Sequence, residues 1–404
     1  MKMTKYKLGE LVEVTRGASL SGQFYAEEGK LIRLTLGNFN MNGGGFKENT
    51  SKTDLYFTGT VRDEFILNKG DIITPLTEQS LGLLGTTARI PESGKYIQSQ
   101  DVALVRCKEG LLDPNFCYYL ISSSIVRQQL SAAAQQTKIR HTSPEKIKDC
   151  TVWVPDFYTQ KNIGRILTDI DNKIAINRRI NDNLEAMAKQ LYEYWFVQFD
   201  FPNEEGKPYK SSGGAMVWNE KLKREIPQGW NILPISDILD KYPTTKRYET
   251  KEYLQIGKYP IIDQGDAYIV GFTNENDNLL TRHPAVLFGD HSTKVKFLDF
   301  DFARGADGTQ ILYSSNDAVS QYYLYLVVSA LQIPNPGYSR HFKYLKELPI
   351  VIPSLSIATK FVNIVKPLFE KWTKNIFNNI ALTKQRDELL PLLMNGQASV
   401  NYHL

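Results

Sequence analysis

The sequence predicts an α+β protein with an internal repeat: two mixed, strand-rich domains separated by two long antiparallel α-helices. These helices would form a coiled-coil spacer related by a pseudo-two-fold axis. Three observations lead to this fold class. A stretch predicted to be helical over residues 158–199 has no Pro or Gly after Gly164, its pattern returns 198 residues later, and short β-type runs between Gly, Pro and Asn turns fill most of the remainder.

The first long helix carries apolar residues at the alternating three-and-four spacing of a coiled coil. The apolar positions are Ile163, Leu167, Ile170, Ile174, Leu184, Ala188, Leu191 and Trp195. Asn177 and Asn181 fill two further positions of this seam. An asparagine in an apolar seam lowers stability but fixes the register, because its amide must find a partner.

The second long helix, predicted over residues 354–397, repeats this seam at the shift that takes Pro155 to Pro353. Its seam positions are Phe361, Val365, Leu368, Trp372, Asn375, Asn379, Leu382, Arg386, Leu389 and Leu393. Antiparallel pairing would bring the two asparagine layers together. Two unrelated amphipathic helices, each packed on its own domain, are the alternative. Pro367 and Pro391 interrupt the second helix, which predicts a separate turn or a kink at its start.

The first domain is predicted over residues 1–157, with strands at 71–76, 86–90, 101–107 and 150–155. A helix is expected over Asp113–Leu130, entered through Asp-Pro. Another helix should begin at Thr142-Ser143-Pro144-Glu145, which has capping-box spacing and a Pro suited to the first helical position.

Residues 200–225 are rich in Gly, Pro, Ser and charge, which predicts a surface linker. The second domain, 226–353, begins and ends like the first. Ile235–Ile238 echoes Leu8–Leu11, and a Val- and Ile-rich strand precedes Pro353 as one precedes Pro155. Within it, residues 285–312 predict two strands joined by a polar turn, and residues 398–404 form a tail. Constant ends around different middles suggest one scaffold with two specificities.

Both domains carry Arg-His on a loop near their ends, at Arg140-His141 and Arg340-His341. Such a pair suits contact with phosphate or bidentate bonding to guanine, and a solvated loop with incidental charge is the alternative. The candidate DNA-contacting residues are Arg16, Thr77, Gln79, Lys138, Arg140 and His141 in the first domain, and His291, Thr293, Lys294, Tyr338, Arg340 and His341 in the second. Asp290 beside His291 also admits a catalytic or metal pair, although no third ligand is near it in the sequence.

Composition sets further bounds. The net charge is +4, and residues 226–353 carry 12 basic and 14 acidic side chains, so bulk charge does not identify a nucleic-acid-binding protein. The three cysteines predict neither a disulfide framework nor a zinc site. The sequence has no long apolar run and no signal-peptide pattern, so a cytoplasmic protein without membrane contact is expected. It also lacks a Walker loop, GxGxxG, HExxH and CxxC, which predicts a recognition module without catalytic or metal-binding residues.

The longest distinctive strings of the chain resemble the specificity subunit of bacterial type I restriction–modification enzymes. These strings are residues 171–200, 206–230, 287–302 and 383–400, and the resemblance covers essentially the whole chain. It implies two target-recognition domains, each recognising one half of a split double-stranded DNA site, with the helices setting the gap.

The resemblance also implies partners: two modification (methyltransferase) subunits docked on the helices, and restriction subunits that join them. S-adenosylmethionine, ATP and Mg are expected on those partners, and no cofactor is expected on this chain. Two hypotheses from other classes remain open at this point. One is a DNA methyltransferase or nuclease with a diverged active site, and the other is a coiled-coil adaptor with no DNA role.

Overall fold

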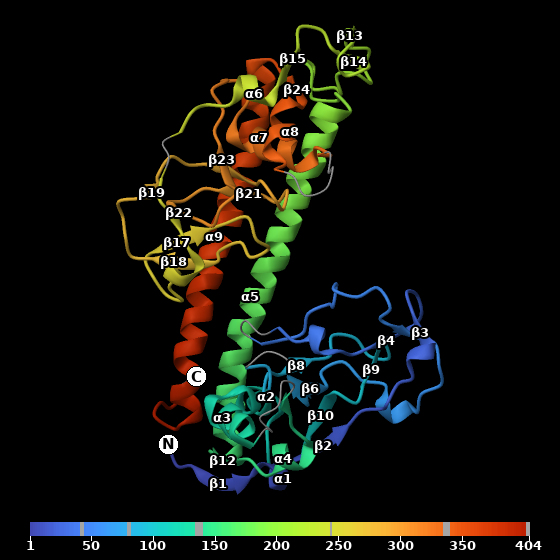
Figure 1. Ribbon diagram of the computed structural model, residues 1–404, viewed down its shortest axis with the longest axis vertical. Coiled ribbons are helices and arrows are strands. Elements are labelled where there is room, and N and C mark those ends of the chain that lie inside the picture. Colours follow the sequence, from blue (N-terminus) through green and yellow to red (C-terminus); the bar gives the residue numbers. More distant parts are fainter. Residues whose placement is uncertain (41–43, 79–81, 134–139, 243–244, 334–339, 401–404) are drawn as a thin grey trace. The chain divides into compact units, whose positions relative to one another are not determined.

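The computed structural model describes residues 1–40, 44–78, 82–133, 140–242, 245–333 and 340–400. The chain forms two compact units, one of Met1–Ile176 with Asn378–Leu404 and one of Asn177–Phe377. Each unit contains one part of the long helix α5 (Phe157–Tyr192) and one part of the long helix α9 (Leu355–Met394), drawn in green and red in Figure 1.

The first unit contains two four-stranded sheets whose strands are mostly antiparallel. One has the order β2-β10-β6-β8, with all neighbours antiparallel. Its strands are β2 (Val12–Arg16), β10 (Val102–Cys107), β6 (Ile72–Pro75) and β8 (Ala88–Arg89). The other, in the order β3-β5-β4-β9, contains β3 (Tyr25–Ala26), β5 (Tyr56–Phe57), β4 (Leu31–Arg33) and β9 (Tyr96–Ile97). The strands predicted over 71–76, 86–90 and 101–107 appear here as β6, β8 and β10.

The first unit has short helices whose boundaries correct two expectations. The helix predicted over Asp113–Leu130 is two helices, α2 (Pro114–Ser122) and α3 (Ser124–Ala133), because Ser123 has the extended angles φ −66° and ψ 154°. Helix α4 (Pro144–Lys148) is capped by Ser143, whose side chain accepts from the Lys146 amide, and not by Thr142 as the capping-box spacing predicted. Pro144 does occupy the first turn.

The second unit contains two sheets. One follows β16-β22-β17-β18, with β19 also pairing with β22, and the other follows β21-β20-β23. Their strands are β16 (Arg247–Tyr248), β17 (Tyr259–Ile262), β18 (Gly271–Thr273), β19 (Leu279–Leu280), β20 (Ala285–Gly289), β21 (Val295–Leu298), β22 (Phe302–Gly305) and β23 (Thr309–Leu312). Residues 285–312 thus form four strands and not the predicted two, because β22 lies between β21 and β23 in the sequence but pairs in the other sheet.

The ends of the two units repeat the same small assembly. In the first, β1 (Thr4–Lys7) pairs with β12 (Thr151–Val154), and β1 leads into α1 (Leu8–Leu11). In the second, β15 (Asn231–Pro234) pairs with β24 (Pro349–Ile352) and leads into α6 (Ile235–Ile238). Helices α7 (Gln321–Ala330) and α8 (Phe342–Glu347) complete the second unit. The expected linker is partly ordered as a hairpin of β13 (Met216–Asn219) and β14 (Arg224–Pro227).

Both long helices are present with slightly different ends from those predicted. Helix α5 spans Phe157–Tyr192 and continues as a π-helical turn over Glu193–Val197. Helix α9 spans Leu355–Met394 without a break, so Pro367 does not separate a first turn from the rest of the helix. Pro367 is exposed, as is Asn363, whose carbonyl group has no helical donor at Pro367.

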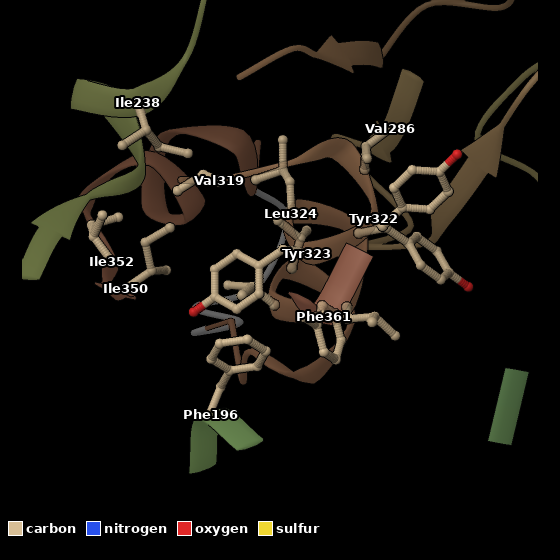
Figure 2. Packing of buried hydrophobic residues seen from close by; sticks show 14 of the residues in the cluster. Phe196, Ile238, Val286, Val319, Tyr322, Tyr323, Leu324, Ile350, Ile352 and Phe361 are labelled. Atoms are coloured by element: carbon tan, nitrogen blue, oxygen red, sulfur yellow. The ribbon is translucent and has the colours of Figure 1, made fainter. Parts of the chain in front are cut away.

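The helices pack into the cores of both units. In the second unit, Phe196 lies against Tyr323 of α7 and Phe361 of α9, with ring centroids 4.6 and 4.8 Å apart in edge-to-face arrangements (Figure 2). Such pairs add about 0.5–1.5 kcal/mol each beyond the burial of their area. In the first unit, Ile163 and Leu167 of α5 join Leu393 of α9 in the main apolar cluster. The predicted seam is therefore the face that each helix buries.

The two helices run antiparallel within each unit. In the first, Asp171 contacts Arg386 and Ile174 contacts Asn379, so positions rise along α5 as they fall along α9. In the second, Asn181 contacts Trp372 and Trp195 contacts Phe361 in the same order. None of the helices in the described residues has both the length and the apolar character needed to span a bilayer.

Candidate nucleic-acid interface

The Arg-His loop of the first unit forms a short strand beside the loop that was predicted to contact DNA. Strand β11 (Arg140–His141) pairs antiparallel with β7 (Thr77–Glu78), placing Arg140 opposite Glu78 and His141 opposite Thr77. The Thr142 amide continues the ladder by donating to the Leu76 carbonyl over 2.8 Å. The strand pair thus brings Thr77 next to Arg140 and His141, which lie more than 60 positions later in the sequence.

Glu78 organises this ladder, although the sequence did not single it out. Its carboxylate is buried, and Oε2 accepts from the amides of Gly82, Leu83 and Leu84 at 3.1, 2.9 and 3.0 Å. Its Oε1 lies 3.2 Å from Nη1 of Arg140. A buried carboxylate needs this many partners because an unpaired charge there would be costly.

Arg140 is consequently held by the protein itself. Its side chain is only 19% exposed, and besides Glu78 it donates to the carbonyl and hydroxyl oxygens of Ser131. His141 next to it is exposed. Of the two neighbours, His141 has the more accessible side chain for a ligand, and Arg140 stabilises the loop that presents it.

The other candidates of the first unit differ in exposure. Arg16 is exposed, and its Nε donates to the Gln100 carbonyl over 2.8 Å. Thr77 is buried and donates to Asp101 over 3.0 Å, so its hydroxyl serves the fold. Gln79 and Lys138, like Tyr338 of the second unit, lie outside the described residues.

In the second unit the polar turn between β20 and β21 is fixed to the Arg-His loop. Asp290 and His341 are both buried. The Asp290 carbonyl accepts from the His341 amide at 2.8 Å and from its Nδ1–H at 3.0 Å, and the Asp290 carboxylate accepts from the Phe342 amide at 2.8 Å. Asp290 and His341 therefore join two loops. Among the described residues no group of three His, Cys, Asp or Glu side chains is placed to hold a metal ion.

Gln264 connects three loops of this unit. Its Oε1 accepts from the His291 amide at 2.9 Å, its Nε2 donates to the Asp307 carbonyl at 2.7 Å, and its own carbonyl accepts from the Ser292 hydroxyl at 2.6 Å. Gly308, the residue after Asp307, has φ +81°. A Cβ at this position would lie 2.6 Å from the side-chain Nε2 of Gln264. The close approach requires glycine at that position.

Lys296 supports the Gln264 loop from inside. Its side chain is 6% exposed, and Nζ donates to the carbonyls of Asp263 and Ala267 at 2.7 and 2.5 Å. Burial lowers the pKa of Lys296 to about 8, and the carboxylates of Asp263 and Asp266 oppose that shift. The loop that carries Gln264 is thus held at both ends by one ammonium group.

The remaining predicted contact residues of the second unit have exposed side chains. His291, Thr293, Lys294 and Arg340 are all exposed, and Thr293 adopts φ +55° at the tip of the turn. Lys294 lies 2.6 Å from Asp266, and Arg340 lies 3.7 Å from Asp307. Ion pairs this exposed are worth at most about 1 kcal/mol, so a phosphate could replace either carboxylate at little cost.

The two Arg-His loops therefore differ although their sequences match. Arg140 is enclosed by Glu78 and Ser131, whereas the Arg340 side chain is 68% exposed. His141 is exposed, whereas His341 is buried. The accessible member of the pair is the histidine in one unit and the arginine in the other.

The paired asparagines give the two units a common feature. In the second unit Asn181 Nδ2 donates to the Trp372 carbonyl at 3.0 Å, and Asn375 Nδ2 donates to Asn181 Oδ1 at 2.8 Å. In the first, Asn379 Nδ2 donates to the Ile174 carbonyl at 3.4 Å, which is the equivalent bond under the 198-residue shift. Asn177, the fourth residue, is buried.

Comparison with known proteins decides the family. Residues 1–186 and 227–382 match the family described as type I restriction modification DNA specificity domain. The chain belongs to this family. The two matching segments correspond to the two predicted halves, and the resemblance drawn from the sequence is confirmed.

Curated relatives are similar over most of the chain. One is the type I restriction enzyme MjaIX specificity subunit of Methanocaldococcus jannaschii, 25% identical over 318 residues that cover 72% of this chain and 71% of that protein. Another is the HindI specificity subunit of Haemophilus influenzae, 22% identical over 387 residues that cover 75% and 81%. The function of the family is sequence-specific DNA recognition, and the chain is a non-catalytic specificity subunit. The hypotheses of a diverged enzyme or an adaptor without a DNA role find no support.

A solved structure supports the fold. The crystal structure of the type I restriction–modification S subunit from M. genitalium superposes with a TM-score of 0.57 at 18% identity, covering 98% of this chain and 96% of that one. The predicted fold class, mixed strand-rich domains with long antiparallel helices, is thereby confirmed.

Proposed function

We propose that this specificity subunit recognises a bipartite double-stranded DNA site. The strand-rich domain of the first unit would recognise one half, the domain of the second unit would recognise the other, and the two helices would set the gap between them. The duplication supports this proposal. Equivalent asparagine bonds and equivalent β1/β12 and β15/β24 ends accompany Arg-His loops whose side-chain contacts differ.

The exposed polar residues of those loops are the proposed contacts. In the first domain they are Arg16 and His141, with Gln79 and Lys138 retained from the sequence. In the second they are His291, Thr293, Lys294 and Arg340, with Tyr338 retained from the sequence. Arginine and lysine suit phosphate oxygens or the guanine edge, and histidine and threonine can bond to base edges in the major groove. Thr77, Arg140 and His341 are assigned a positioning role, because their polar groups already have partners within the protein.

The proposed partners follow from the family and its named relatives. We expect two modification subunits on the helices and restriction subunits joining that core. S-adenosylmethionine would be bound by the modification subunits, and ATP and Mg would be used by the restriction subunits. This division of labour agrees with a chain whose sequence contains no nucleotide-binding or methyltransferase motif.

An exchange of domain middles tests the proposal. Residues 244–335 are replaced by the corresponding segment of another specificity subunit, and residues 18–136 are exchanged in a second chimera. Methylation-sensitive sequencing of DNA from cells that carry the whole complex then gives the methylated motif. Each chimera should change one half of the motif and leave the other half and the gap unchanged. A chimera that alters both halves would show that the domains do not recognise DNA independently.

A further inference from the structure

The asparagine layer of the helix seam does not distinguish α5 from α9. The bond from Asn181 to the Trp372 carbonyl in the second unit and the bond from Asn379 to the Ile174 carbonyl in the first are related by the internal repeat. The same amides would therefore be satisfied if α5 paired with α5 of another copy, or α9 with α9. The layer selects the register and the antiparallel direction, but not the partner.

One charged contact beside the seam breaks this symmetry. In the first unit Arg386 of α9 is 10% exposed in its side chain, and its Nη1 lies 2.8 Å from Oδ1 of Asp171 on α5. The Tyr119 hydroxyl donates to the other oxygen of Asp171 at 2.6 Å. The repeat-equivalent positions in the second unit are Ala188 and Phe369, and both are buried in its core.

The two sets of residues complement each other in charge and in size. A large cation is matched with a small anion in one unit, and a small Ala is matched with a large Phe in the other. Pairing α5 with α5 would instead match Ala188 with Asp171 twice, leaving space and a carboxylate without its arginine. Pairing α9 with α9 would match Arg386 with Phe369 twice, which overfills the seam and leaves the guanidinium without the Asp171 carboxylate.

We propose that Asp171 and Arg386, together with Ala188 and Phe369, form a pairing code that makes α5 accept only α9 and excludes a second copy of either helix. Such a code acts against wrong partners through mismatched size and unpaired charge. It keeps two different recognition domains together, where the symmetric asparagine layer alone would allow identical ones to associate. The inference concerns assembly of the chain and does not depend on which DNA is bound.

A cut chain provides the test. A protease site is placed in the exposed turn at residues 204–206, and the folded protein is cut there into an α5-containing piece and an α9-containing piece. After unfolding and refolding, native mass spectrometry measures the mixed pair and the two homotypic pairs. The wild-type pieces should form only the mixed pair.

Arg386→Ala should weaken this selection. With Ala at that position, the mixed pair contains one Ala·Asp and one Ala·Phe match, the same matches that the two homotypic pairs contain. Homotypic pairs should therefore appear beside the mixed pair. The charge-exchanged variant Asp171→Arg/Arg386→Asp should restore the mixed pair. Lys384→Ala is the matched control, because it removes an exposed ion pair with Glu388 on the same helix and should leave selection intact.

Two results would overturn the proposal. One is homotypic pairs from the wild-type pieces in statistical proportions, and the other is a mixed pair alone from Arg386→Ala. If the Arg386→Ala pieces do not refold, the uncut chains decide. Light scattering after refolding at rising concentration should detect chain-exchanged dimers for Arg386→Ala and none for the wild type, and equal dimer fractions in both would refute the code.

Discussion

Gln264→Ala should loosen the recognition surface of the second domain while leaving the first untouched. The substitution removes two hydrogen bonds made by the side chain, those to the His291 amide and the Asp307 carbonyl. At roughly 1 kcal/mol net for each bond, the free energy of unfolding should fall by about 2 kcal/mol. The turn that presents Thr293 and Lys294 then has to be ordered when DNA binds. Ordering the turn therefore makes the free energy of DNA binding less favourable by a similar amount. This corresponds to about a 10- to 30-fold rise in Kd.

The assay measures binding of the assembled complex to duplexes in which one half of the methylated motif is scrambled. Gln264→Ala should lose discrimination at the second half only. Gln98→Ala is the matched control, because Gln98 also donates two hydrogen bonds, to the Thr15 and Val102 carbonyls, but belongs to the first unit. Urea unfolding checks that both variants lose similar stability. If Gln264→Ala weakened discrimination at both halves equally, or at neither, the assignment of these loops to one half-site would be refuted.

Three other predictions concern Arg140, Arg340 and Lys296. Arg140→Ala should lower the free energy of unfolding by about 1–3 kcal/mol, because it leaves buried Glu78 without its cation. Arg340→Ala should barely change stability and should weaken DNA binding, with a flatter salt dependence if its contact is a phosphate. Equal stability losses in denaturant titrations would contradict this difference. Stability should also rise between about pH 8 and pH 9.5, because folded Lys296, whose pKa is about 8, has lost its proton there while the unfolded state still holds it. Lys296→Met should lack this rise, and identical pH profiles for the two proteins would contradict the buried ammonium.

The long helices could be predicted from the sequence because their signal is local. A seam of period 3.5 with asparagines at matching positions sets the buried face of each helix residue by residue. The repeated ends, Leu8–Leu11 with Ile235–Ile238, were found for the same reason. The break at Ser123 was missed, since its extended conformation depends on packing around it and not on a Gly or Pro.

The candidate sites were less accessible to sequence reasoning. Arg140 and Arg340 have the same neighbour in sequence, yet one is enclosed and the other exposed, because Glu78 approaches only Arg140 through a non-local strand pair. Gln264 and Lys296 act on backbone groups of loops that meet only in the folded unit. The one signal for Gln264 was its Asp-Gln-Gly turn directly after a buried strand.

The most direct test of the account lengthens the helical spacer. Four residues are inserted after Asn181 in α5 and four before Asn375 in α9, the facing positions implied by their hydrogen bond. Each insertion adds about 6 Å of helix, or on the order of two base pairs at roughly 3.4 Å per base pair. Four residues also keep the seam nearly in phase.

Sequencing of methylated DNA from cells with the altered complex gives the result. The two half-site sequences should be unchanged, and the gap between them should grow by about two base pairs. The same four residues inserted in the exposed turn at 204–206 should leave the gap as it was. An unchanged gap with the longer helices, or altered half-sites at the original gap, would contradict the claim that the paired helices set the spacing.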